Sequence, residues 1–118
     1  MSRRRIYKSV AAGVVDAPCS KSYAHRNLLA AFLSSRGGEG CTVRDVELSN
    51  DVSATLDCIR ALGGRFRYED GAIVMEPSAP VDCQMPELCC RESGSTLRFF
   101  IPVALALCGK ARFAGTSR

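Results

Sequence analysis

The sequence has no tryptophan, a single histidine and few aromatic residues, which make up 7% of its 118 residues. Proteins that bind single-stranded nucleic acid stack bases on aromatic side chains, so this composition argues against that class. The formal net charge is +4, but three arginines are adjacent at residues 3–5, a run more typical of a solvated terminus than of a nucleic-acid-binding face. With 47% hydrophobic residues, the chain is expected to form at most one globular domain.

Metal sites and disulfide frameworks are poorly supported. The seven cysteines are odd in number and contain no C-x-x-C pair, so no metal is expected. Cys58 falls in a helical pattern and Cys108 ends an apolar run, and both are predicted to be small buried thiols. The only histidine, His25, lies beside Arg26, whose charge disfavours its protonation, so we expect a neutral, structural histidine.

Long hydrophobic segments are also missing. The longest apolar run, residues 97–108, contains a proline and is too short to span a bilayer. The basic N-terminus has no apolar segment long enough for a secretory signal. Together with the cysteine usage, these absences predict a soluble, cytoplasmic protein with neither a nucleic acid nor a membrane as partner.

Apolar periodicity and turn residues predict alternating strands and helices. In chain order we expect one or two short strands over 6–15, a helix over 22–33, a strand over 41–48, a helix from 49–51 to 63–64, a hairpin over 65–75, a connecting loop over 76–90, a helix from Ser93 to Gly109, and a strand over 111–114. This order predicts an α/β unit followed by the start of a second copy.

The most informative segment is the start of the first predicted helix, Ala-Pro-Cys-Ser-Lys-Ser-Tyr-Ala-His-Arg over residues 17–26. Ser20 and Ser22 are of the type that caps helices, and the unpaired N–H groups of a first helical turn attract anions. Lys21 and Arg26 add two positive charges to the helix dipole. Capping alone explains the serines, whereas the added cations favour a site for a phosphate or a carboxylate.

A similar arrangement recurs at the start of the last predicted helix. Arg26 follows Ser22 by four residues, and Arg98 follows Ser95 by three, so each pair lies on one helical face. Gly94 either allows a ligand to approach the backbone or serves a plain turn. One such segment is most simply a capped helix, but its recurrence in two successive units favours one anion site in each unit.

Several motifs, in the same order, resemble the enolpyruvyl transferases, and among them the EPSP synthases. They are Pro18-x-Ser20-Lys21-Ser22 with Arg26, Leu48-x-Asn50-Asp51-Val52 with Thr55-Leu56, Ala61-Leu62-Gly63, and Ser93-Gly94-Ser95-Thr96-x-Arg98. The resemblance implies an α/β (α+β) fold of βαβαββ units from an inside-out α/β barrel, incomplete in this chain. Residues 1–16 would be strands of the opposite domain, and residues 17–118 the first unit and the start of the second.

The resemblance also implies transfer of the enolpyruvyl group of phosphoenolpyruvate to the 5-hydroxyl of shikimate 3-phosphate, with release of phosphate and with no metal or organic cofactor. Both substrates are polyanions, so cationic helix starts would neutralise and position them. By position, the substrate contacts would be Lys21 for both substrates, Ser22 and Arg26 for shikimate 3-phosphate, and Gly94 and Arg118 for phosphoenolpyruvate, with Asp51, Ser95 and Arg98 lining the cleft.

The chain departs from the family pattern at three positions. Cys19 stands where Gly or Pro is usual, Ser95 where Thr is common, and Glu92 where the family generally has Asn. The carboxylate of Glu92 would repel a phosphate unless Arg91 or Arg98 pairs with it. The family's proton-transfer carboxylates have no counterpart here, so the resemblance implies an N-terminal part that needs the remainder of the enzyme chain and is inactive alone.

Other functions remain open. UDP-N-acetylglucosamine enolpyruvyl transferases share the fold and the donor, but they typically have Lys-Asn in place of Lys21-Ser22 and a reactive cysteine around residues 115–118. A basic nucleic-acid-binding module would use residues 3–5 and both helix starts, and its affinity for oligonucleotides would depend on salt. In a non-catalytic structural domain, replacing Lys21 or Arg26 by alanine would not change ligand binding.

Overall fold

The computed structural model describes residues 2–79 and 84–116. These residues form three helices and five strands, arranged as two sheets. In chain order the elements are α1 (Lys21–Ser35), β1 (Cys41–Val43), α2 (Asn50–Ala61), β2 (Arg65–Glu69), β3 (Ala72–Glu76), β4 (Glu87–Cys89), α3 (Gly94–Cys108) and β5 (Arg112–Ala114). This mixture of helices and small sheets confirms the predicted fold class.

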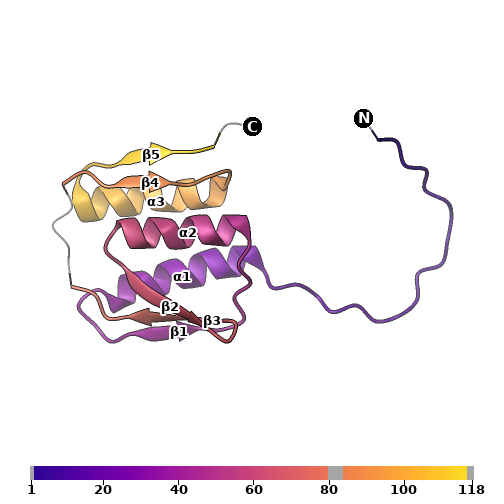
Figure 1. The fold of residues 1–118 in the computed structure, drawn as a ribbon, viewed down its shortest axis with the longest axis horizontal. Coiled ribbons are helices and arrows are strands. Elements are labelled where there is room, and N and C mark those ends of the chain that lie inside the picture. The colour runs from indigo at the N-terminus through magenta and orange to yellow at the C-terminus, as the bar shows by residue number, and fades with distance from the viewer. Residues whose placement is uncertain (1, 80–83, 117–118) are drawn as a thin grey trace.

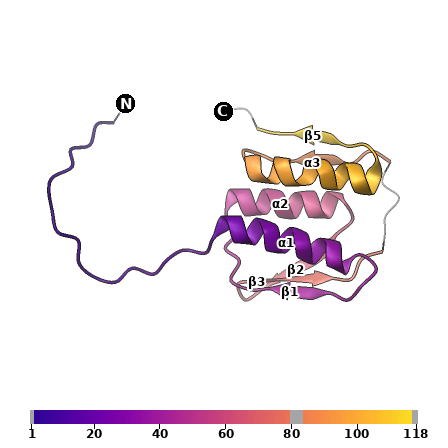
Figure 2. The same ribbon diagram turned by 180° about the vertical axis from the view of Figure 1, so that it is seen from behind.

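The three helices lie side by side and run in the same direction, with one sheet beside α1 and the other beside α3 (Figures 1 and 2). The first sheet is antiparallel with strand order β1-β3-β2, and the second is the parallel pair β4-β5. α2 packs between α1 and α3 and also contacts β4. As a result, the N-termini of all three helices lie at the same edge of the molecule.

One apolar core joins the helices to both sheets. Burying a large aliphatic or aromatic side chain contributes about 1.5–3 kcal/mol, so a few such residues fix the helix layer. A side chain at Gly64 would collide with Ile59 and come within 2.9 Å of the ring of Phe32, which explains the glycine after α2. The largest fully buried apolar residues are Leu28, Phe32, Ile59, Leu62, Ile73, Met75, Leu88 and Phe100.

The predicted helices and the hairpin are confirmed. In the turn between β2 and β3, Asp70 and Gly71 have φ values of 48° and 74°, as a two-residue hairpin turn requires. Gly109 ends α3 in the left-handed conformation, with φ of 73°. These features depend on local sequence, which is why the pattern identifies them.

Two strand predictions need correction. The strand expected over 41–48 ends at Val43, because Asp45 has φ of 55°, which interrupts extended backbone. β4 lies inside the loop expected over 76–90. Its three residues are too short for an alternating pattern to be recognised, and it forms only because β5 pairs with it from a distant part of the chain.

The strands expected over residues 6–15 are absent from the structure. Residues 2–20, which we call the N-terminal arm, contain no helix or strand and extend away from the body (Figure 1). Ile6, Val10 and Val14 are 94%, 94% and 97% exposed. A strand needs a hydrogen-bonded neighbour, and no strand among the described residues pairs with the arm.

The cysteines give a mixed outcome. Cys58 is a free, buried thiol as predicted, 3.9 Å from the thiol of Cys90, and burial raises its pKa. Cys108 is disulfide-bonded, so the prediction of a buried thiol there is wrong, since an apolar run does not reveal a partner in space. The argument for a cytoplasmic location rested in part on the absence of disulfides, so this bond weakens it. The cytoplasmic location stays a prediction. In the described part of the chain, no helix is long and apolar enough to cross a membrane.

Candidate functional site

The N-terminal turns of the three helices share one local arrangement. The first two N–H groups of each helix have no acceptor among the described residues. The third N–H of each helix donates to the hydroxyl of the preceding serine: Tyr23 to Ser20, Val52 to Ser49, and Thr96 to Ser93, at 3.4, 3.2 and 3.2 Å. The arrangement therefore occurs three times, where the sequence suggested two.

This edge of the molecule favours anions. Each helix N-terminus carries the equivalent of about half a positive charge, and its open N–H groups are donors directed at a ligand. Because α1, α2 and α3 begin at the same edge, these partial charges add (Figure 1). Exposed cationic side chains of α1 and α3 lie among them.

Lys21 is the first residue of α1, and its Nζ lies 3.3 Å from Oδ2 of Asp51 in the first turn of α2. The structure thus brings together two residues that the resemblance placed in one cleft. The Lys21 side chain is 60% exposed. An exposed ion pair is worth about 0–1 kcal/mol, so a phosphate can replace Asp51 as the partner of this ammonium at little cost.

Arg26 is held on the exposed face of α1. Its Nη1 donates to the backbone oxygen of Ser22 over 2.9 Å, and its guanidinium lies 5.2 Å from the ring centroid of Phe99 in α3. The predicted shared face of Ser22 and Arg26 is confirmed. Ser22 does not cap the helix, and its exposed hydroxyl has no partner among the described residues.

Gly94 begins α3, and nothing in the described chain requires glycine there. Its φ is not left-handed, and an added Cβ would meet no atom within 4 Å. The backbone therefore gives no support to the turn explanation that the sequence left open, and a ligand-binding role for Gly94 stays a prediction. Ser95 and Arg98 are exposed on the same helix, and neither side chain has a partner among the described residues. Arg118 lies outside the described residues.

A pocket of about 300 Å³ opens beside Ser93 and Gly94 at the N-terminus of α3. Glu92 also lines it and is exposed. Within residues 2–79 and 84–116, neither Arg91 nor Arg98 forms an ion pair with Glu92. The carboxylate that departs from the family pattern is therefore not neutralised by either arginine considered for it.

Arg91 has a different task, which the sequence did not reveal. Its Nη1 donates to Asn50 Oδ1 over 2.8 Å, and its Nη2 donates to Asp57 Oδ2 over 2.7 Å. Its φ of 50° is uncommon for a side-chain-bearing residue. These contacts fix the β4–α3 connection on α2 and so position the N-terminus of α3 relative to that of α2.

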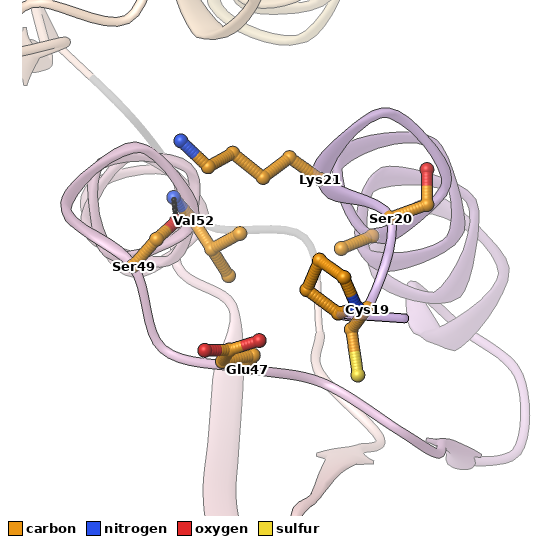
Figure 3. A pocket seen from close by; sticks show the side chains of 8 residues that line it. Cys19, Ser20, Lys21, Glu47, Ser49 and Val52 are labelled. Carbon is orange, nitrogen blue, oxygen red and sulfur yellow. Dashed lines mark hydrogen bonds between the residues drawn. The ribbon is translucent and has the colours of Figure 1, made fainter. Parts of the chain in front are cut away.

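A second pocket, of about 180 Å³, lies between the N-termini of α1 and α2 (Figure 3). Lys21 extends from α1 toward α2, and the carboxylate of Glu47 lies on the opposite side of the pocket (Figure 3). Val52 and Pro18 contribute apolar walls. A polyanion inside this pocket would face Glu47, so we place the anion-binding groups on the exposed edge around Lys21.

Beneath this edge, four buried polar side chains connect the three helices. We call His25, Thr55, Thr96 and Ser93 the buried polar chain. His25 Nδ1 lies 2.6 Å from Thr55 Oγ1, which lies 2.9 Å from Thr96 Oγ1, and the latter lies 2.7 Å from Ser93 Oγ. The sequence analysis named Thr55 and Thr96 only as members of motifs and gave them no role, because the contact between them joins residues far apart in the chain.

The surroundings of His25 favour its neutral form, which is the direction that the sequence predicted. His25 is 4% exposed, and burial is the main reason why its pKa lies below the usual 6.5. The carboxylate of Asp51 acts in the opposite direction, whereas the charges of Lys21 and Arg26 lower the pKa further.

Comparison with known proteins decides the family. Residues 7–118 match the family model for EPSP synthase (3-phosphoshikimate 1-carboxyvinyltransferase). The chain belongs to the EPSP synthase family. This confirms the resemblance carried by the two serine-rich helix starts and by the motif at α2.

Curated relatives agree with this assignment. The chain is 34% identical to the 3-phosphoshikimate 1-carboxyvinyltransferase of Clostridium botulinum (strain Eklund 17B / Type B), over 98% of this chain and 27% of the relative. It is 36% identical to that of Clostridium perfringens (strain SM101 / Type A), over 87% and 24%. For Nitrosopumilus maritimus (strain SCM1) the identity is 33%, over 85% and 23%. The chain thus spans about a quarter of the length of these relatives.

Proposed function

We propose that this chain provides part of the substrate site of a 3-phosphoshikimate 1-carboxyvinyltransferase. The reaction transfers the enolpyruvyl group of phosphoenolpyruvate to the 5-hydroxyl of shikimate 3-phosphate and releases phosphate. Family membership and the names of the relatives support this assignment. The observation that carries it for these residues is the set of three helix N-termini at one edge, with open N–H groups and exposed cations around them.

The substrates explain why these groups gather at one edge. Lys21 lies between the N-termini of α1 and α2 and serves both polyanions, while Ser22 and Arg26 bind the phosphate of shikimate 3-phosphate. Gly94 leaves room for phosphoenolpyruvate against the open N–H groups of α3. Arg118 is proposed as a further phosphoenolpyruvate contact. Asp51, Ser95 and Arg98 line the cleft.

The chemical contribution of these residues is positioning and charge neutralisation. Holding two anionic reactants in contact removes much of the entropic barrier, and fixed donors stabilise charge that develops on the phosphate and carboxylate oxygens. No residue of this chain is assigned to proton transfer. Proton transfer is proposed for groups in the remainder of the enzyme chain. We also propose that the protein is cytoplasmic.

The domain assignment is also a proposal. Residues 17–118 would form the first βαβαββ unit and the start of a second, which the order β4-α3-β5 supports. Residues 1–16 would form strands of the opposite domain. The exposed apolar side chains of the arm support this, because they need a sheet that the described residues do not offer.

The role of Lys21 is tested by titrating shikimate 3-phosphate into this chain and into its Lys21→Ala variant. A charge-assisted hydrogen bond is worth about 1.5–3 kcal/mol, so we expect the affinity to fall about 10- to 100-fold. Lys8→Ala is the matched control, since it removes the same charge from the N-terminal arm and should not change the affinity. Equal affinities for the wild-type chain and Lys21→Ala would refute the assignment.

A further inference from the structure

The buried polar chain links the anion edge to the interior, and its protons can be counted. It contains three links: His25 to Thr55, Thr55 to Thr96, and Thr96 to Ser93. Each link uses one proton, and each hydroxyl has one to donate. Because burial makes an unused hydroxyl proton costly, the donors along the chain must point in one consistent direction.

In the first direction, every donor points toward α1. Ser93 donates to Thr96, Thr96 to Thr55, and Thr55 to Nδ1 of His25. The imidazole then accepts at Nδ1 and carries its proton on Nε2. All three hydroxyl protons are used inside the protein, so this direction suits an empty site.

In the second direction, every donor points toward α3. His25 donates from Nδ1 to Thr55, Thr55 to Thr96, and Thr96 to Ser93. The hydroxyl proton of Ser93 then needs an acceptor outside the chain, and Ser93 lines the pocket at the N-terminus of α3. A phosphate or carboxylate oxygen bound there is such an acceptor.

We propose that the buried polar chain reports occupancy of the α3 pocket to His25: an anion that accepts from Ser93 selects the Nδ1–H tautomer, whereas the empty pocket leaves the Nε2–H tautomer. Thr55 and Thr96 are then positioning residues that couple the two substrate-binding helices through α2. This inference rests on the proposed function, because it takes phosphoenolpyruvate as the anion.

The change of tautomer has a route for its proton. Nε2 of His25 has no partner among the described residues. The only fully buried side-chain polar atom without a partner among those residues is Ser78 Oγ, so Nε2 is not fully buried and is in contact with solvent. The second direction is reached when Nε2 gives its proton to water and Nδ1 takes the hydroxyl proton of Thr55. Thr55 then takes the proton of Thr96, Thr96 takes that of Ser93, and Ser93 takes a proton from water in the pocket. The total number of protons on the chain stays the same.

The coupling also places His25 among the charges that hold substrate. Lys21, Arg26 and Asp51 all act on its pKa, so the imidazole lies within electrostatic reach of the α1 edge. An acceptor at α3 therefore changes the hydrogen bonding of a group close to the proposed shikimate 3-phosphate contacts. Binding of phosphoenolpyruvate at α3 would therefore change the hydrogen bonding near the shikimate 3-phosphate contacts on α1 without movement of a helix.

The test is imidazole ¹⁵N NMR of this chain at a pH above 7, where neutral His25 is the only histidine observed. We expect the Nε2–H tautomer in the free chain and the Nδ1–H tautomer when phosphoenolpyruvate is added. The backbone amides of Gly94 and Ser95 report binding in the same sample. Thr55→Val keeps the shape of the side chain but interrupts the links, so it should abolish the response, and Thr55→Ser should restore it.

The outcomes separate this inference from the proposed function. If the Gly94 and Ser95 amides shift while His25 keeps its tautomer, the coupling is wrong and the anion site stands. An Nδ1–H tautomer in the free chain also overturns the coupling. If phosphoenolpyruvate leaves both amides unchanged, the α3 anion site fails, and the coupling fails with it. The wild-type spectra alone decide between these results, even if Thr55→Val does not fold.

Discussion

At the scale of single residues, the glycine that begins α3 separates a requirement of folding from a requirement of binding. Gly94→Ala should not lower the free energy of unfolding, because the added Cβ meets nothing within 4 Å and the backbone is not left-handed. Alanine favours a helix over glycine by up to about 1 kcal/mol. The same methyl group would occupy the space proposed for phosphoenolpyruvate at the start of α3, so the affinity of the chain for phosphoenolpyruvate should fall. Urea unfolding and ligand titration measure the two effects.

Gly64→Ala is the matched control for this prediction. Its Cβ would collide with Ile59 and crowd the ring of Phe32 in the core, and such overpacking costs about 1–3 kcal/mol. Gly64→Ala should therefore destabilise the chain, and Gly94→Ala should not. A loss of stability in Gly94→Ala with unchanged affinity would show that the glycine serves the fold.

At the scale of elements, the three serine caps look alike in sequence but differ in structure. Ser20 is exposed, and its hydroxyl accepts from Tyr23 over 3.4 Å. Ser93 is 5% exposed, and its hydroxyl contacts both the N–H and the hydroxyl of Thr96. Removing Ser93 leaves the buried hydroxyl of Thr96 without one partner, whereas water can replace the exposed hydroxyl of Ser20 as the acceptor for the N–H of Tyr23.

We therefore expect Ser93→Ala to lower the free energy of unfolding by about 1–3 kcal/mol, and Ser20→Ala by less than about 1 kcal/mol. Urea unfolding of the two variants under the same conditions measures the difference. Equal losses would mean that both serines act as simple caps, and that the contact between Ser93 and Thr96 adds nothing to stability.

The limits of sequence reasoning are clearest for elements. A serine caps the N-terminus of each helix, and Gly109 ends α3, so local chemistry was enough to predict the helices. β4 was missed because its stability comes from β5, which lies beyond the intervening helix. The pairing of Lys21 with Asp51 was not predicted, because the resemblance gave the first only as a substrate contact and the second only as a residue that lines the cleft. The contact between Thr55 and Thr96 depends on how α2 packs against α3, which no local pattern contains.

At the scale of the whole molecule, the helices and sheets are held together by an apolar core to which the N-terminal arm does not contribute. The helix layer and both sheets share one core, whereas apolar residues of the arm are almost fully exposed. The apolar residues that predicted strands over 6–15 are a property of the sequence, but a strand forms only beside another strand. Residues 6–15 therefore have a composition typical of strands but form no strand among the described residues.

This contrast predicts that removing residues 2–16 leaves the urea midpoint of unfolding unchanged, since those residues have no hydrogen-bonded strand partner in the described structure. Brief trypsin treatment should cleave the intact chain after Arg3, Arg4, Arg5 or Lys8, because proteases need extended, accessible backbone. Arg60 is the internal control: its side chain is 65% exposed but its backbone is in α2, so cleavage there should be much slower. A lower midpoint without the arm, or an arm cleaved no faster than Arg60, would mean that the arm packs against the body.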